Sequence, residues 1–225
     1  WVAAAAQESV SVEGKECLAC HESTTPGIVE QWRDSRHAGA KVDCYSCHKA
    51  NANDPATFDH YGKKIAVIVT PNYCARCHEP EVKEFQASHH ADAAKFIGSL
   101  DNVLGEVVEG SPAAINGCMQ CHGSTVVYRG EGKFDPATWP NSGIGRINPD
   151  GSKGSCAACH GRHSFSSAQA RHPENCGKCH MGPDHPQAEI YAESKHGIQF
   201  RANVAKMNLE SRTWIVGKDY YSAPT

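Results

Sequence analysis

Long apolar segments are missing from this chain. No stretch approaches the roughly 20 consecutive apolar residues that a helix needs to cross a bilayer, so we expect no membrane span. Hydrophobic residues make up 40% of the 225 positions, and the mean hydropathy is negative. A conventional hydrophobic core would therefore be thin for a chain of this length. A packed interior needs a further apolar component.

A basic stripe with interleaved aromatic residues is also missing. The chain has 22 Lys and Arg against 25 Asp and Glu, which gives a formal net charge of −3. Nucleic-acid binding is therefore unsupported. This charge leaves out any bound cofactor, so it identifies no partner.

Cysteine, by contrast, is plentiful, and all 12 cysteines fall in one repeated motif, Cys-x-x-Cys-His. The six copies are Cys17–Cys20–His21, Cys44–Cys47–His48, Cys74–Cys77–His78, Cys118–Cys121–His122, Cys156–Cys159–His160 and Cys176–Cys179–His180. This motif is the attachment signature of c-type haem: the thiols bond to the porphyrin and the His ligates the iron. Zinc ribbons and disulfides are the alternatives, but neither requires a His after every pair. The sequence therefore predicts six covalently bound haem c groups.

These haems would supply the missing apolar component. We expect residues 1–225 to form a single multihaem cytochrome c domain. Its fold should be mainly α, with the haems forming the core, long loops and little or no β structure. Haem c is attached outside the cytoplasm, so we expect a periplasmic location or an equivalent lumen, which would be the anammoxosome in an anammox organism. Residues 1–7 are interpreted as a signal-peptide remnant or a disordered start, because small residues precede Gln7 as at a cleavage site.

Eight histidines lie outside the motifs: His37, His60, His89, His90, His163, His172, His185 and His196. A six-coordinate haem needs a second ligand, and spare histidines are the usual source. We expect at least five haems to have two His ligands. The distal ligands should come from His37, His60, His89 or His90, His163, His172 and His196. A surface position is the alternative for His37.

Local patterns predict three helices outside the motifs. Thr25 as N-cap and Pro26 at the first position predict a short helix that ends near His37. Its apolar face would hold Ile28, Val29 and Trp32. Apolar residues at three- and four-residue steps predict a long amphipathic helix from Pro80 to Leu100. A last helix should begin at Pro186 and run towards Met207.

Two stretches have no helical pattern. Residues 51–73 are expected to be loop-like, although the β-branched run Ile65–Val69 would be either the only strand or a segment packed against a haem. Residues 129–155 are rich in Gly, Pro, Asn and Ser. They predict a long loop, and long loops in compact domains are often functional.

Three segments carry a family resemblance. They are CGKCHMGPDHPQAEIYAESKHG from Cys176, the Thr-Pro-x-Ile-Val and Ser-Arg-His segments after the first motif, and Cys118–His122 with its trailing Gly-Ser. They resemble the hydroxylamine oxidoreductase (HAO) family of octahaem cytochromes, which includes the hydrazine-oxidising enzymes of anaerobic ammonium oxidation. The resemblance runs through nearly the whole chain. The family carries eight haems, whereas this chain has six motifs, so we expect the N-terminal portion of a longer octahaem protein or a naturally short relative.

The resemblance implies that the fourth haem, on Cys118, Cys121 and His122, is catalytic. Its open distal face would be lined by Asp184 and His185. Oxidising a small nitrogenous substrate releases protons, so an acid/base pair is needed there, and His suits this role near neutral pH. The alternative for Asp184 and His185 is a helix N-cap followed by a surface His. The resemblance also implies a homotrimer and a soluble cytochrome c as electron acceptor.

Three functional hypotheses remain open. The first is oxidation of hydroxylamine or hydrazine at an open fourth haem. The second is a non-catalytic electron-transfer protein in which every iron has two His ligands. The third is a nitrite-reducing relative, although the Cys-x-x-Cys-Lys site of cytochrome c nitrite reductases is absent. The tyrosine that crosslinks to the catalytic haem in oxidising HAO members has no counterpart here, because Tyr220 and Tyr221 lie too early.

Overall fold

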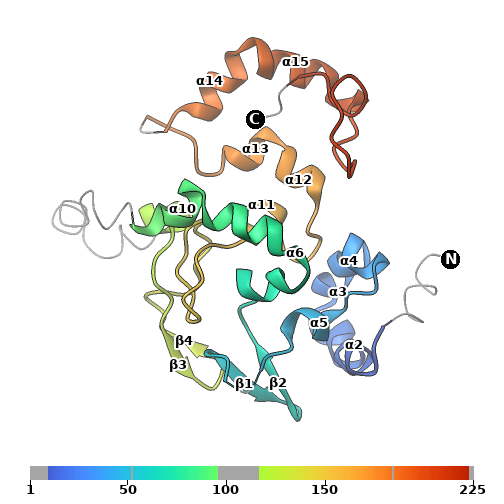
Figure 1. The fold of residues 1–225 in the computed structure, drawn as a ribbon, viewed down its shortest axis with the longest axis vertical. Coiled ribbons are helices and arrows are strands. Elements are labelled where there is room, and N and C mark those ends of the chain that lie inside the picture. The colour runs from blue at the N-terminus through green and yellow to red at the C-terminus, as the bar shows by residue number, and fades with distance from the viewer. Residues whose placement is uncertain (1–9, 52, 96–116, 184, 223–225) are drawn as a thin grey trace.

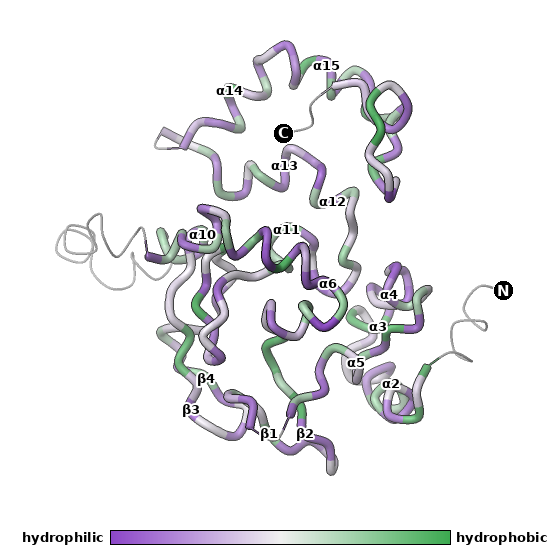
Figure 2. Tube along the Cα trace, in the orientation of Figure 1, coloured by the Kyte–Doolittle hydropathy of each residue, from purple (hydrophilic) through white to green (hydrophobic). Residues whose placement is uncertain are grey.

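The computed structural model describes residues 10–51, 53–95, 117–183 and 185–222 (Figure 1). These residues form many short helices and two small hairpins, which confirms the predicted mainly-α fold. Figure 2 shows apolar residues in short segments scattered among polar ones. None of the helices in these ranges is long and apolar enough to cross a membrane. The predicted signal-peptide remnant at residues 1–7 lies outside the described residues.

Four helices form the N-terminal group: α2 (Val12–Thr24), α3 (Pro26–Arg33), α4 (Arg36–Gly39) and α5 (Cys44–His48). Their small apolar core consists of Val10, Leu18, Val29, Trp32 and Ala38. The helix predicted after Thr25 is confirmed as α3, but it ends before His37, which lies in α4. Ser35 separates the two helices because its hydroxyl caps α4 by accepting a hydrogen bond from the Ala38 amide. Of the three residues placed on the apolar face, Val29 and Trp32 are buried, whereas Ile28 is 43% exposed.

A hairpin occupies part of the segment that was predicted to be loop-like. Strand β1 (Thr57–His60) pairs antiparallel with β2 (Lys63–Ala66), and Phe58 lies opposite Ile65. The turn residues Tyr61 and Gly62 both have positive φ, as a tight two-residue hairpin turn requires. The prediction of a loop was therefore wrong here, because the turn geometry pairs a polar strand with the start of the β-branched run. A second hairpin joins β3 (Tyr128–Gly130) and β4 (Lys133–Phe134).

Helix α6 (Pro71–Gln86) carries the third motif. The backbone of His78 leaves the helical region, two residues before Pro80, so the helix predicted from Pro80 is the second half of α6. It does not continue to Leu100: α6 ends at Gln86 and the 3-10 helix η1 (His89–Asp92) follows. Ser88 interrupts the helix because its backbone is extended, a conformation that serine readily adopts at helix ends. Residues 96–100 lie outside the described residues.

Four short helices come next in the described residues: α10 (Cys118–His122), α11 (Ala157–His160), α12 (Ser167–Arg171) and α13 (Pro173–Cys176). Between α10 and α11, residues 129–155 are mostly irregular apart from the second hairpin, as predicted. Arg146 orders this loop: it is 4% exposed and donates hydrogen bonds to Asn148 Oδ1 (2.8 Å) and the Asn141 carbonyl (3.0 Å). Burial lowers the pKa of Arg146 to about 10, so the buried side chain is still charged at neutral pH.

The predicted last helix is divided into α14 (Gln187–Glu193), α15 (Lys195–Asn203) and the 3-10 helix η2 (Val204–Lys206). Ser194 causes the division because its side chain accepts a hydrogen bond from Gly197 N and so caps α15. Figure 1 shows α14 and α15 at one end of the molecule and the two hairpins at the other, with α6, α10 and α11 between them. Apolar burial is sparse in every part, as expected for a thin polypeptide core.

Candidate haem-binding sites

Each Cys-x-x-Cys-His motif folds into about one helical turn. Four motifs lie within helices α2, α5, α6 and α10, and Cys156 is the N-cap of α11. In the sixth motif, the amides of Cys179 and His180 both donate to the Cys176 carbonyl, which makes an equivalent turn. Residues three and four apart lie on one helix face, so both sulfurs and the imidazole are presented together. None of the 12 cysteines is fully buried or disulfide-bonded, so their sulfurs are accessible to an attached haem.

Three motif histidines are oriented through their Nδ1 atoms. His48 Nδ1 lies 2.8 Å from the Ala66 carbonyl, and His122 Nδ1 lies 3.3 Å from the Ala93 carbonyl. His21 Nδ1 lies 2.9 Å from Thr25 Oγ1. A hydrogen bond at Nδ1 fixes the ring and leaves Nε2 for a metal. The residues present therefore fit haem iron, for which this group supplies a one-electron redox centre when bound.

Spare histidines face motif histidines across a nearly constant gap. The ring centres of His21 and His60 lie 6.3 Å apart, and those of His37 and His78 lie 6.1 Å apart. His90 and His180 also lie 6.1 Å apart. A histidine–metal bond is about 2 Å long, so two imidazoles on opposite sides of one metal have ring centres roughly 6 Å apart. Each pair thus has the spacing that one shared iron requires.

The electrostatics of the spare histidines favour the neutral, metal-binding form. Burial and the neighbouring His78 lower the pKa of His37. Burial and His180 lower the pKa of His90 in the same way. For His163, burial and then the charge of His48 lower the pKa, so His163 is the spare histidine near the second motif. Only the deprotonated ring nitrogen binds a metal, and these environments maintain it.

His185 is near the fourth motif, as the resemblance implied. Its ring centre lies 5.9 Å from that of His122, and its side chain is exposed on the polypeptide. Asp184, the other predicted catalytic residue, lies outside the described residues. Sequence reasoning placed His185 at this motif but did not anticipate a spacing that matches the three pairs above.

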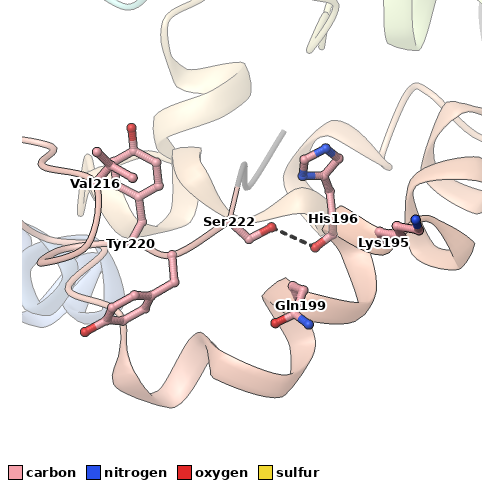
Figure 3. Close-up of a pocket in the computed structure, with 7 residues that line it drawn as sticks. Lys195, His196, Gln199, Val216, Tyr220 and Ser222 are labelled. Carbon is pink, nitrogen blue, oxygen red and sulfur yellow. Dashed lines mark hydrogen bonds between the residues drawn. The ribbon is translucent and has the colours of Figure 1, made fainter.

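The remaining spare histidines lie elsewhere. His89 is next to His90 in η1, and its charge acts on the His90 ring. His172 packs against Phe200 with ring centres 5.4 Å apart and bonds to Glu174 through Nδ1. His196 lines a cavity of about 410 Å³ together with Tyr220 and Ser222, whose hydroxyl donates to the His196 carbonyl (Figure 3). The ligand roles assigned to these three residues stay predictions.

The thiols of motifs that are not consecutive in the sequence lie close together. Cys74 donates a hydrogen bond to Cys156, which lowers the pKa of Cys156 to about 7. Burial and then a hydrogen bond with Cys121 raise the pKa of Cys179 to about 11. Cysteines that are bonded to haem no longer titrate. The pKa shifts therefore matter here only because they show which thiols lie close to one another. These contacts put the third motif beside the fifth, and the fourth beside the sixth.

Charge effects between more distant cysteines show which of the other motifs are neighbours. Burial and then the charge of Cys17 raise the pKa of Cys44 to about 11. The pKa of Cys47 is raised by burial, by Asp43 and by Cys77. Cys176 acts in the same way on Cys159, after burial. Together with the two hydrogen-bonded pairs, these neighbours connect the motifs in the order first, second, third, fifth, sixth, fourth.

A zinc site does not explain the motifs. Among the described residues, no three or more His, Cys, Asp or Glu side chains are grouped so that they could hold a metal ion, whereas a structural zinc site uses four such ligands. The thiols instead meet two at a time, Cys74 with Cys156 and Cys121 with Cys179, which is fewer than the four ligands of a structural zinc site.

Comparison with known proteins supports the same cofactor. Residues 149–225 match the family model described as seven times multi-haem cytochrome CxxCH, and residues 73–161 match the model for cytochrome c554 and c-prime. The chain is 32% identical over 222 residues to a probable nitrite reductase-hydroxylamine oxidoreductase fusion protein of Kuenenia stuttgartiensis. That match covers 93% of this chain and 24% of the relative.

Two solved structures have a similar fold. A hypothetical multiheme protein is 33% identical with a TM-score of 0.84, covering 97% of this chain and 53% of that one. A reducing HAO-like protein complex of K. stuttgartiensis is 27% identical with a TM-score of 0.65, covering 93% and 40%. The chain thus spans about a quarter of the curated relative and about half of the first structure. The fold is that of multihaem cytochromes c, the matching family models indicate covalently bound haem c, and the relatives include HAO-like multihaem proteins.

Proposed function

We propose that this chain is an electron-transfer segment that binds six haem c groups, one at each motif. The observation that carries the proposal is the unbroken succession of neighbouring motifs, from the first through the third, fifth and sixth to the fourth. No motif is isolated from the series. A succession of this kind serves electron passage between distant points of a protein, because each redox centre then has a neighbour.

The histidine pairs support the same function. His60, His37 and His90 each stand at ligand spacing from a motif histidine. An iron with two His ligands has no free position for a substrate, and its potential depends on its ligands, hydrogen bonds and burial. We therefore propose that these irons exchange electrons without binding small molecules. A soluble cytochrome c outside the cytoplasm is the proposed acceptor.

A kinetic experiment tests this function. The haem-loaded protein is reduced with dithionite, freed of excess reductant and mixed with oxidised cytochrome c in a stopped-flow instrument. We expect every haem of the chain to be reoxidised, with one cytochrome c reduced per haem. Haems that stay reduced while others are oxidised would contradict a connected series.

Oxidation of hydroxylamine or hydrazine is the second candidate function. It is favoured by the similarity to a protein named as a nitrite reductase-hydroxylamine oxidoreductase fusion. In this case the fourth haem would be open, with Asp184 and His185 as the acid/base pair and a homotrimer as the assembly. Sustained reduction of cytochrome c by hydroxylamine or hydrazine, beyond one electron per haem, would favour this function over electron transfer alone. A reductase that runs on nitrite would instead consume electrons from reduced cytochrome c.

A further inference from the structure

Arg146 is a buried cation whose hydrogen-bond partners on the polypeptide are neutral. The residue is 4% exposed, and it donates to the side-chain oxygen of Asn148 (2.8 Å) and to the carbonyl of Asn141 (3.0 Å). Among the residues that the structure describes, no ion pair involves Arg146. Buried charges in proteins are normally paired, because removing an ion from water is costly. The described part of the chain therefore gives this side chain hydrogen bonds but no ion-paired anion.

Two further contacts of Arg146 leave its charge in place. The guanidinium carbon lies 5.6 Å from the centre of the Trp139 ring, and this cation–π contact attracts the charge without cancelling it. Asp150 acts on Arg146 through its charge, but its Oδ2 accepts hydrogen bonds from Thr70 (2.5 Å) and Asn72 (3.0 Å). Within the described ranges, the hydrogen bonds of the guanidinium use Nε and Nη1, and Nη2 donates none. One corner of the guanidinium is therefore available to a ligand.

A second guanidinium lies close to the first. Burial is the largest cause that lowers the pKa of Arg146, and the charge of Arg162 is the next. Arg162 also forms no ion pair in the part of the chain that the structure describes. Two like charges repel each other, whereas an anion near both would stabilise their approach. A carboxylate suits this position, since guanidinium groups bind carboxylates through two parallel N–H donors.

The loop at Arg146 lies beside the fourth and fifth haem motifs. A Cβ on Gly123, which follows the fourth motif, would lie 2.5 Å from the Arg146 amide nitrogen. The hydrogen bond with Cys74, and after it the charge of Arg146, lower the pKa of Cys156 in the fifth motif. Haem c carries propionate carboxylates. Haem attachment at these motifs therefore supplies the class of anion that this guanidinium binds.

We propose that Arg146 binds a propionate carboxylate of the haem at the fourth or fifth motif and raises the reduction potential of that haem. The inference rests on the haem attachment in the proposed function and adds a residue that tunes one centre of the series. An unpaired propionate places negative charge near the iron and favours the ferric state. A guanidinium that neutralises the propionate favours the ferrous state instead. Because ligands, hydrogen bonds and burial also set haem potentials, the test has to separate the charge of Arg146 from its hydrogen bonds.

An equilibrium redox titration of the haem-loaded protein, followed by absorbance and electron paramagnetic resonance (EPR), makes this separation. Arg146→Gln keeps side-chain N–H donors but removes the charge. It should shift the equilibrium of one haem roughly tenfold towards the oxidised form, which lowers its midpoint by about 59 mV. Arg146→Lys keeps the charge and should stay close to wild type. Arg129→Gln, in the same loop, removes an exposed charge that Asp135 already balances, and it should shift no midpoint.

Two outcomes of the titration would overturn the proposal. If Arg146→Gln leaves every midpoint unchanged, the charge does not act on a haem. If Arg146→Lys shifts a midpoint as far as Arg146→Gln does, Arg146 acts only by ordering its loop. The titration uses no cytochrome c, so a failure of electron transfer to that acceptor would leave its result unaffected, and the two proposals fail separately.

A crystal structure of the haem-loaded wild type decides the question if Arg146→Gln fails to take up haem. A propionate oxygen should lie about 3 Å from a guanidinium nitrogen of Arg146. The thioether bonds of that haem, to Cys118 or to Cys156, identify the motif to which it belongs. An Arg146 side chain with no haem carboxylate beside it would contradict the proposal.

Discussion

The carboxylate of Asp43 binds Ser11 and so joins the first two haem motifs. One oxygen accepts hydrogen bonds from the Ser11 amide (3.0 Å) and hydroxyl (2.5 Å). Ser11 is the N-cap of α2, which carries the first motif, and Asp43 is the N-cap of α5, which carries the second. The other oxygen accepts from Ser46 N at 2.8 Å, and Asp43 is only 3% exposed. One buried side chain therefore fixes the starts of two haem-bearing helices.

Replacing this carboxylate should destabilise the protein. Asp43→Ala removes a helix cap, which costs about 1 kcal/mol, and it removes the hydrogen bonds from Ser11 to a charged group, which are worth about 1.5–3 kcal/mol. We expect the free energy of unfolding to fall by about 2–4 kcal/mol, measured by denaturant titration with circular dichroism. Asp34→Ala, at an exposed carboxylate of the same helix group, should change it by less than about 0.5 kcal/mol. Equal losses in both variants would contradict the role of Asp43.

The same residue should make stability depend on pH. Burial alone would raise the pKa of Asp43, but the hydrogen bonds from Ser11 and Ser46 outweigh it and the net pKa is lowered. A group with a lowered folded pKa stabilises the protein above its unfolded pKa of about 3.9. That stabilisation is lost as the pH falls through the lower folded value.

Asp43→Asn isolates this effect because it keeps the cap and removes the titration. The stability advantage of wild type over Asp43→Asn should be constant from about pH 5 to pH 7. It should shrink below about pH 4. A stability advantage that is unchanged at pH 3, or that grows on acidification, would show that the ionised Asp43 carboxylate does not contribute this stability.

Gly123 should tolerate no side chain. It follows His122, has φ +89°, and a Cβ there would lie 2.5 Å from the Arg146 amide nitrogen. Gly62 has a similar φ of +76° with open space around it. Gly62→Ala should therefore cost about 1 kcal/mol from backbone strain, measured by thermal unfolding. Gly123→Ala should cost clearly more and disturb the haem at the fourth motif. Similar melting temperatures for the two variants would contradict the close packing at Gly123.

The number of haems follows from the motifs. All 12 cysteines are accessible and none forms a disulfide, so we expect every motif to carry a haem. The intact mass of this segment under denaturing conditions should exceed that of the polypeptide by six haems. A smaller excess, or zinc in an elemental analysis, would contradict the count.

The haem-attachment motifs could be identified from the sequence alone, because covalent attachment requires a fixed local spacing. It also predicted α3, since Pro26 at the first helical position acts locally. It could not give the pairing of His37 with His78 or of His60 with His21, because ligands meet only through tertiary packing. Nor could it show how far the ring of His185 lies from that of His122.

The errors in the predicted elements have the same physical origin. Apolar periodicity predicted continuous helices through Ser88 and Ser194, but both serines adopt extended backbone and begin new helices. The composition around Asn51 predicted a loop where the structure has a hairpin. The strands of this hairpin are defined by their pairing and by the turn at Tyr61 and Gly62. Ile28 was placed on the apolar face by spacing alone, although only Val29 and Trp32 face the small core.

The most direct measurement is the EPR spectrum of the oxidised wild-type protein before and after addition of cyanide, which binds an open ferric iron without reducing it. If this chain only transfers electrons, the irons of the six motifs give low-spin signals and cyanide leaves them unchanged. A high-spin signal of one iron per chain that cyanide converts to low spin, and that disappears when Cys118 and Cys121 are replaced by Ala, would contradict the account and assign an open catalytic haem to the fourth motif.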